Sequence, residues 1–298
     1  MSLNKTASAP DDVCPGPDLN PRNPSIEVPA GACDCHVHIY APPERHPYKE
    51  KRRYTPAPEI LGPGAYLKMA DALGLERAVL VQPGIYPDNE VTVEALKASG
   101  GKWRGVAAVL DANVSRQELK RLDEAGFRGV RFNPRNTKLV ALKDLEIIAG
   151  KIAEFGWHAQ IHMDARDLVD LADRFRKLPV DIVIDHMGRI PPAEAGIDHP
   201  GFQALLALMR EGKCWVKLSA PNRFGDPRPP YPQVVPIARA LVQAAPERCV
   251  WASDWPHTRE YGHMPNDGEL LNLLAVWAPD AGDRRLILVD NPARLYRF

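Results

Sequence analysis

The alternation of short apolar segments with longer amphipathic ones is the feature that most restricts what this chain can fold into. Eight short runs, rich in β-branched residues and bounded by glycine, proline or charge, have the pattern of buried strands. They cover residues 32–39, 77–82, 105–110, 129–133, 157–162, 181–185, 214–218 and 249–253. Helical patterns alternate with them at residues 64–73, 88–99, 115–125, 142–155, 166–177, 201–211, 234–244 and 267–277. Strict alternation predicts a parallel sheet, and eight such units predict a closed (β/α)8 barrel.

An open, doubly wound sheet is the alternative fold for this pattern. It is less economical for eight units, and no G-x-G-x-x-G sequence follows a predicted strand. Many of the 30 prolines lie before residue 64, and proline resists both helix and sheet. We therefore expect residues 1–28 to form a poorly structured N-terminal arm and residues 29–298 to form a single, distorted barrel domain. Residues 41–63 are expected to be a long loop of functional importance.

The charge balance excludes several classes of function. Lys and Arg total 38, as do Asp and Glu, so the formal net charge is zero. A neutral chain argues against an overall nucleic-acid-binding or membrane-binding surface. We find no run of about 18 apolar residues and no apolar N-terminal segment, and so expect neither a transmembrane helix nor a secretory signal. Five cysteines, an odd and sparse set, predict reduced thiols in a cytoplasm rather than a disulfide framework.

Four histidines and one aspartate follow predicted strands. His36 and His38 alternate at the end of the first strand, which places both imidazoles on one face. His162 ends the fifth run, His186 follows the sixth, and Asp254 follows the eighth. Active sites of (β/α)8 barrels lie at the C-terminal ends of the strands, so we expect these side chains to converge. Imidazoles with a carboxylate predict an open site for a first-row metal ion, whereas buried core histidines and a helix N-cap at Asp254 are the competing interpretations.

The ordered set of motifs resembles the amidohydrolase superfamily, and within it the branch of 2-pyrone-4,6-dicarboxylate lactonases and sulfomuconolactone hydrolases. Besides His36-x-His38, the resemblance rests on residues 129–133 (GVRFN), 184–189 (IDHMGR), 254–257 (DWPH) and 291–296 (NPARLY). It extends from about residue 28 to the C-terminus. It implies a hydrolase in which Asp254 is the general base for attack of water on a lactone carbonyl. The imidazoles of His36, His38 and His186 would polarise that carbonyl, directly or through a metal.

The resemblance leaves two possibilities for the metal. The 2-pyrone lactonases work without a metal and carry a tyrosine where this chain has His162, whereas the related sulfomuconolactone hydrolases are metal-dependent. His162 restores the fifth-strand ligand of mononuclear amidohydrolases, and the fourth strand ends without a Lys or Glu to bridge two ions. We therefore expect one divalent ion, Zn²⁺ or Mn²⁺, with metal-independent catalysis as the alternative. The expected ligands are His36, His38, His162 and Asp254.

Basic residues in the same loops predict an anionic substrate. Guanidinium groups bind carboxylates and sulfonates bidentately, although solvated loop charge is the competing interpretation for each arginine. The expected substrate-binding residues are Arg131, Arg135, Arg189, Arg223, Arg259, Tyr54 and Gln82. We expect a small anionic lactone or carboxylate substrate, opened by hydrolysis in the breakdown of aromatic compounds.

Three other functions stay open for a chain of this pattern. The same barrel could isomerise a sugar-acid lactone, with the aspartate serving an intramolecular transfer. It could instead decarboxylate an aromatic acid with one metal ion. A non-catalytic protein that binds a small anion is the third possibility, and it fits less well because every reactive position is filled.

Overall fold

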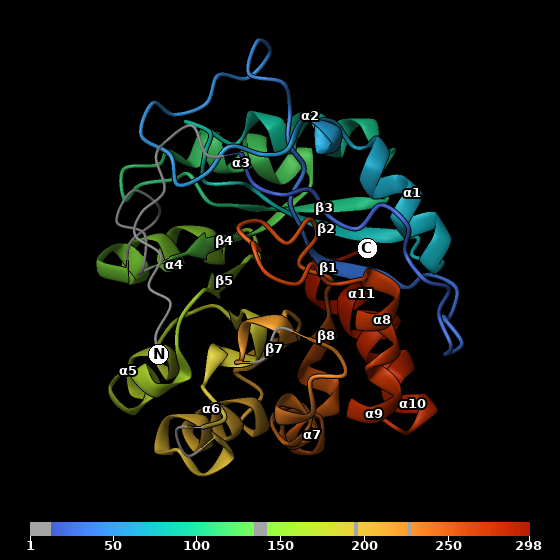
Figure 1. The fold of residues 1–298 in the computed structure, drawn as a ribbon. Helices are drawn as coiled ribbons and strands as arrows, with labels where there is room; N and C mark the ends of the chain where they lie inside the picture. The colour runs from blue at the N-terminus through green and yellow to red at the C-terminus, as the bar shows by residue number, and fades with distance from the viewer. Residues whose placement is uncertain (1–12, 134–141, 194–195, 226–227) are drawn as a thin grey trace.

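A ring of eight parallel strands forms the centre of the molecule, and helices surround it (Figure 1). The computed structural model describes residues 13–133, 142–193, 196–225 and 228–298. The strands are β1 (Cys33–Val37), β2 (Arg77–Val81), β3 (Trp103–Ala107), β4 (Phe127–Phe132), β5 (His158–Ile161), β6 (Ile182–Ile184), β7 (Cys214–Leu218) and β8 (Cys249–Trp251). Each pairs with the next in sequence order, and a parallel bridge between Val37 and Trp255 closes the ring. The predicted (β/α)8 barrel is confirmed.

The helices lie between successive strands as predicted, with small differences in extent. They are α1 (Gly64–Leu73), α2 (Glu90–Ala98), α3 (Arg116–Ala125), α4 (Leu145–Ala153), α5 (Leu168–Arg176), α6 (Pro200–Arg210) and α7 (Val235–Ala244). The Ser115 hydroxyl accepts a hydrogen bond from the Glu118 backbone N–H at the start of α3 (3.1 Å), as a capping box requires. None of the described helices is both long and apolar enough to cross a membrane.

Two predicted segments differ from the structure. The expected helix at 267–277 is two short helices, α8 (Asp267–Asn272) and α9 (Leu274–Trp277), and α10 (Ala281–Arg285) and α11 (Asn291–Tyr296) follow them unpredicted. The run at 105–110 forms a strand only as far as Ala107. Beyond it, the backbone N–H groups of Ala108 and Val109 donate to the Asn89 side chain, at 3.2 and 3.3 Å, instead of to a neighbouring strand.

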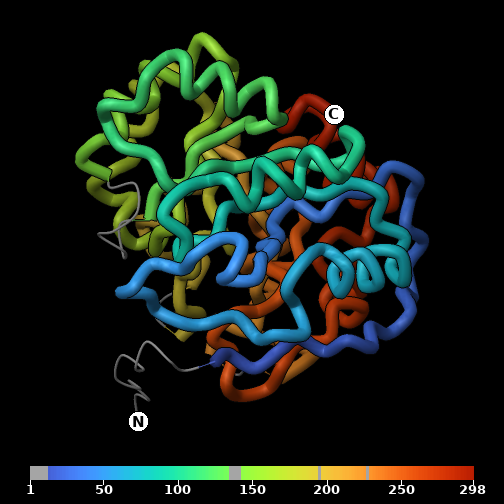
Figure 2. The backbone as a smooth tube through the Cα atoms, turned by 90° about the horizontal axis from the view of Figure 1, so that it is seen from above, coloured from blue at the N-terminus to red at the C-terminus, as the bar shows by residue number. Residues whose placement is uncertain are grey.

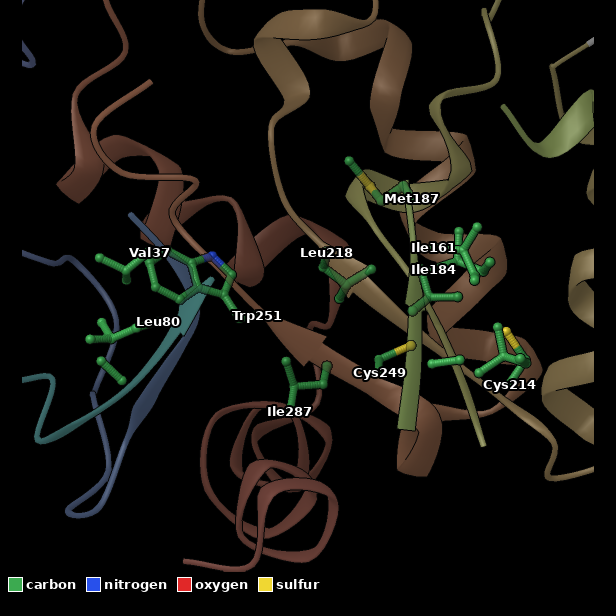
Figure 3. Close-up of a cluster of buried hydrophobic side chains, with 14 of the residues drawn as sticks. Val37, Leu80, Ile161, Ile184, Met187, Cys214, Leu218, Cys249, Trp251 and Ile287 are labelled. Atoms are coloured by element: carbon green, nitrogen blue, oxygen red, sulfur yellow. The ribbon is translucent and has the colours of Figure 1, made fainter. Parts of the chain in front are cut away.

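The core has two layers, one on each side of the strands. Alternate strand residues pack outward against the helices, and Figure 3 shows part of this layer, from Val37 and Leu80 to Leu218 and Trp251. The inward-facing residues of the lower barrel form a second cluster, which includes Cys33 and Cys35 and is closed below by α11. All five cysteines are buried and free. Burial on both faces explains why the strands read as continuous apolar runs.

An irregularity in β1 lets three side chains face the barrel interior within four residues. Cys35 belongs to the inner cluster, and yet the rings of His36 and His38 also share a face, with centroids 5.0 Å apart. Strict alternation forbids this arrangement, so the register with β2 shifts between Asp34 and Val37. At this irregularity the Asp34 carboxylate accepts a hydrogen bond from the His36 backbone N–H (3.2 Å), in place of a partner on the neighbouring strand.

The segment before β1 runs against the C-terminal part of the barrel (Figure 2). The Arg22 backbone N–H donates to the Asn266 side chain (2.9 Å), and a Cβ atom on Gly268 would lie 1.8 Å from the Arg22 carbonyl oxygen. Closer to the N-terminus, the Cys14 backbone N–H donates to the Thr55 carbonyl (2.8 Å). The arm therefore packs on the barrel from residue 13 onward, while the boundary at residue 28 stays a prediction.

Candidate active site

A cavity of about 550 Å³ opens at the C-terminal ends of the strands, where the barrel rule places an active site. It collects most of the residues that the sequence singled out. The predicted residues that line it are His38, His162, His186, Asp254, Arg131, Arg189, Arg223, Arg259 and Tyr54. His36 is fully buried next to them, with its ring centroid 4.8 Å from that of His186.

Several of these residues adopt a backbone conformation that is costly for side chains other than glycine. His186, Arg189, Asp254 and Arg259 have φ angles of 52°, 50°, 69° and 66°. Left-handed backbone at such residues costs about 1–3 kcal/mol each and persists only where the surroundings enforce it. The loops after β6 and β8 therefore hold their polar side chains in imposed positions, as a preorganised site requires.

The imidazoles of the site are neutral at neutral pH. Burial is the main cause: together with Lys217 it lowers the pKa of His36 to about 4, and together with the neighbouring His36 it lowers the pKa of His38 to about 3. The His38 Nδ1 lies 2.7 Å from the Val81 carbonyl oxygen, which can only accept. The proton of His38 is therefore on Nδ1, and its Nε2 is left with a free lone pair.

Asp254 sits between two histidines and an arginine. Its Oδ1 lies 3.8 Å from His36 Nε2 and 3.6 Å from His186 Nε2. Its Oδ2 accepts hydrogen bonds from Nη2 and Nε of Arg223, at 3.1 and 3.2 Å. Burial alone would raise the pKa of Asp254, but His186 and Arg223 hold it well below its usual range. The carboxylate is thus ionised and has one oxygen free to face a substrate or a cation.

A second group of charges lies directly beneath the histidines, and sequence reasoning missed its role. Lys217 is fully buried, and its Nζ lies 3.2 Å from His36 Nδ1, 2.8 Å from Gln160 Oε1 and 3.6 Å from Asp185 Oδ1. Asp185 also accepts a hydrogen bond from Arg131 Nε (2.8 Å). Burial lowers the pKa of Lys217 to about 8. A lysine inside the apolar run CWVKL, at an inward position, was the available signal.

The structure separates His162 from the other expected metal ligands. Its Nδ1 lies 3.1 Å from Arg131 Nη2. A guanidinium only donates, so His162 Nδ1 accepts and the neutral ring carries its proton on Nε2. Among the described residues, His162 belongs to neither of the two groups that could hold a metal ion. His162 thus stands outside both candidate groups, and its expected role as a metal ligand stays a prediction.

Two of the expected substrate-binding residues do not join the described site. Gln82 does not line the cavity, and its side chain is already in use: Oε1 accepts from the Thr92 hydroxyl (2.7 Å) and Nε2 donates to the Pro83 carbonyl (3.2 Å). These contacts tie β2 to α2, and the expected contact of Gln82 with a substrate stays a prediction. Arg135 lies outside the described residues. Tyr54 lines the cavity as expected, with its hydroxyl 2.8 Å from that of Tyr40.

The donor atoms of three residues fit a divalent cation. His36, His38 and Asp254 bring one ligand atom each to within 4.8 Å of one another, all buried. His36 Nε2 is buried and has no hydrogen-bond partner among the described residues, as expected for a nitrogen that faces a ligand. Two imidazoles and a carboxylate leave open positions for water or substrate. A second group, His36, Asp185 and His186, overlaps the first at His36.

Comparisons with known proteins agree with this fold. The amidohydrolase family model matches residues 33–298. A 2-pyrone-4,6-dicarboxylate hydrolase of Comamonas testosteroni is 41% identical, with 93% of each chain covered. A 4-sulfomuconolactone hydrolase of Hydrogenophaga intermedia is 38% identical over 99% of this chain and 98% of its own. A crystal structure of an Agrobacterium tumefaciens protein superposes with a TM-score of 0.85, at 28% identity, over 94% of this chain and 99% of that one. The chain belongs to the amidohydrolase family.

Proposed function

We propose that this enzyme hydrolyses a lactone that carries carboxylate or sulfonate groups, as an enzyme of aromatic-compound breakdown. The observation that carries the proposal is the position of Asp254, an ionised carboxylate set among neutral imidazoles inside a strongly cationic cavity. Two relatives at about 40% identity are named as hydrolases of such lactones. An anionic ester ring would place its carbonyl near the histidines and its acidic groups on the arginines.

In this mechanism Asp254 is the general base. Its free Oδ1 takes a proton from a water molecule while the water oxygen forms a bond to the lactone carbonyl carbon. The ion pair with Arg223 fixes the orientation of the carboxylate and keeps it ionised at neutral pH. The same ion pair makes Asp254 a weak base, so the reaction needs a polarised carbonyl or an activated water as well.

The carbonyl oxygen gains negative charge as the water attacks. The neutral His186 imidazole and the Arg131 guanidinium are suitable donors for this oxygen, and their burial strengthens each interaction. When the tetrahedral intermediate collapses, the bond between the carbonyl carbon and the ring oxygen breaks. Asp254 then returns its proton to the leaving oxygen. At neutral pH the new carboxyl group ionises, so each turnover releases one proton.

A divalent ion, Zn²⁺ or Mn²⁺, is part of the proposal. His36, His38 and Asp254 would hold it, with His186 beside them as a carbonyl polariser. Such an ion would supply a water of lowered pKa and a Lewis acid for the carbonyl. His162 would serve as an uncharged hydrogen-bond donor to the substrate through its Nε2–H.

Proton release in a weakly buffered solution tests the proposal. A panel of anionic lactones is compared with neutral lactones of the same ring size, each with and without added Zn²⁺ or Mn²⁺. We expect one proton per ring opened and a clear preference for the anionic members. Conversion of an anionic sugar lactone without acid release would favour the isomerase instead. Carbon dioxide release from an aromatic acid would favour the decarboxylase, and tight binding without turnover would favour the anion-binding protein.

A further inference from the structure

The cationic lining of the cavity has an inner and an outer part. Arg131 and Arg223 lie deep and are each paired with a carboxylate, Asp185 and Asp254 respectively. Arg53 and Arg259 lie at the mouth, where both side chains are exposed. The inner pair is therefore neutralised by the protein itself, whereas the outer pair is not. Lys49, Lys51, Arg52 and Arg189 complete the basic lining of the cavity.

Among the described residues, no carboxylate forms an ion pair with either member of the outer pair. In the part of the chain that the structure describes, neither Arg53 nor Arg259 has a hydrogen bond or an ion pair. Their like charges are close enough to interact: burial and then the charge of Arg259 lower the pKa of Arg53. Two guanidinium groups that repel each other at the edge of one cavity cost free energy unless an anion lies between them.

The fold holds these two arginines on facing loops. Tyr54, next to Arg53, hydrogen-bonds to Tyr40, and the Thr258 side chain beside Arg259 is near enough to influence the pKa of Tyr54. The backbone carbonyl of Thr258 accepts a hydrogen bond from Arg223 Nη2 (3.3 Å). The outer pair is thus built onto the same framework that positions the catalytic carboxylate.

We propose that Arg53 and Arg259 form an outer anion subsite, which holds an acidic group of the substrate remote from the scissile carbonyl. The inference rests on the proposed function and adds which residues would hold a second acidic group of the substrate. A carboxylate or a sulfonate can accept hydrogen bonds from two guanidinium forks at once, and either group fits this chemistry. A lactone with a single acidic group would leave the subsite empty.

Calorimetric binding of non-hydrolysable aromatic anions to the full chain tests this subsite without requiring turnover. The probes are benzoate, isophthalate and 3-sulfobenzoate, so that the number of charges and the kind of second acid are varied separately. The variants are Arg53→Met, Arg259→Met and the double variant. The matched control is Arg239→Met, which removes an exposed arginine on α7 that does not line the cavity.

We expect each single variant to weaken dianion binding about fivefold and the double variant about twentyfold, the range for solvent-exposed charge pairs. Benzoate binding should change less than about twofold, and the selectivity should shrink at high salt. Isophthalate and 3-sulfobenzoate separate a carboxylate-binding from a sulfonate-binding subsite. Four results would overturn the inference. The variants could lose benzoate binding as much as dianion binding, or lose no binding at all. Arg239→Met could show the same loss, or the wild type could bind the dianions no better than benzoate. Failure of the wild type to open any lactone would refute the proposed function and leave the binding result standing.

Discussion

Asp34 joins the irregular end of β1 to the segment that carries the proposed base. Its Oδ1 accepts from the backbone N–H groups of His36 (3.2 Å) and Ser253 (3.0 Å), and its Oδ2 accepts from the Ser253 hydroxyl (2.5 Å). Burial raises the pKa of this carboxyl to about 7 in spite of these bonds. Two substitutions separate its hydrogen bonding from its charge. Asparagine can keep all three bonds, because its amide oxygen accepts and its NH₂ donates to the hydroxyl, whereas alanine keeps none.

The two variants should differ strongly in stability. A hydrogen bond contributes about 1 kcal/mol net, and a buried donor left without a partner costs about 1–3 kcal/mol. Asp34→Ala should therefore lower the free energy of unfolding by about 3–5 kcal/mol, and it should also lower activity because His36 moves with the bulge. Asp34→Asn should stay within about 1.5 kcal/mol of wild type near pH 5.

The pH dependence gives the sharper comparison. The folded-state pKa, about 7, exceeds the unfolded value of about 3.9, so the folded protein binds more protons at this group between those pH values. The contribution of Asp34 to the free energy of unfolding of wild type therefore falls as pH rises from about 4 to 7, by about 4 kcal/mol at about 1.36 kcal/mol per pKa unit. Asp34→Asn lacks this loss, and at pH 8 it should be more stable than wild type.

Urea unfolding, followed by tryptophan fluorescence and circular dichroism from pH 5 to 8, measures this difference. Other groups titrate alike in both proteins, so the difference curve isolates Asp34. A difference between Asp34→Asn and wild type that stays flat across this range would refute the buried-carboxyl argument. Alanine and asparagine variants of equal stability would refute the hydrogen-bonding argument.

Three further predictions concern the other charged groups. Lys217→Met should lower kcat at least about tenfold with KM nearly unchanged, because the ammonium beneath His36 positions that ring; an unchanged kcat in a folded variant contradicts this. Burial opposes the charge on His257, but Asp267, whose Oδ1 lies 3.0 Å from His257 Nε2, has the larger effect and raises the pKa of His257. The pair therefore stabilises the protein fully below about pH 6.5, and this stabilisation is lost as pH rises through the raised pKa. Asp267→Asn should flatten that part of the Tm profile, and a profile like that of wild type would count against the pair. Chelation should remove both bound Zn²⁺ or Mn²⁺ and activity, with restoration on adding the ion back; full activity at less than about 0.1 equivalent of metal by mass spectrometry argues for metal-free catalysis.

The barrel and the strand ends could be predicted because their signals are local. Apolar periodicity marks each strand. In a (β/α)8 barrel the C-terminal ends of all strands lie around one cavity, and for this reason His38, His186 and Asp254 were predicted to lie together. The contacts that decide the chemistry are not local. Lys217 lies 181 residues from His36 in the sequence, and no pattern links them.

His162 shows where sequence reasoning stops. Its position at the end of β5 was predicted, and it does line the cavity. Its role depends on which ring nitrogen carries the proton, and Arg131, on the neighbouring strand β4, determines that through a single contact. The bulge in β1 could not be predicted in full for the same reason. An aspartate between two cysteines in an apolar strand indicates an unusual position, but nothing in the sequence indicates that its partner is Ser253.

The central claim is that Asp254 acts as the general base of a hydrolysis, and Asp254→Asn tests it most directly. The asparagine keeps the size of the side chain and can still accept from Arg223, so binding of isophthalate should stay within a few-fold of wild type. On the best lactone found in the proton-release assay, we predict that kcat falls about 10²–10⁴-fold. Turnover within about threefold of wild type by the purified variant would contradict the account.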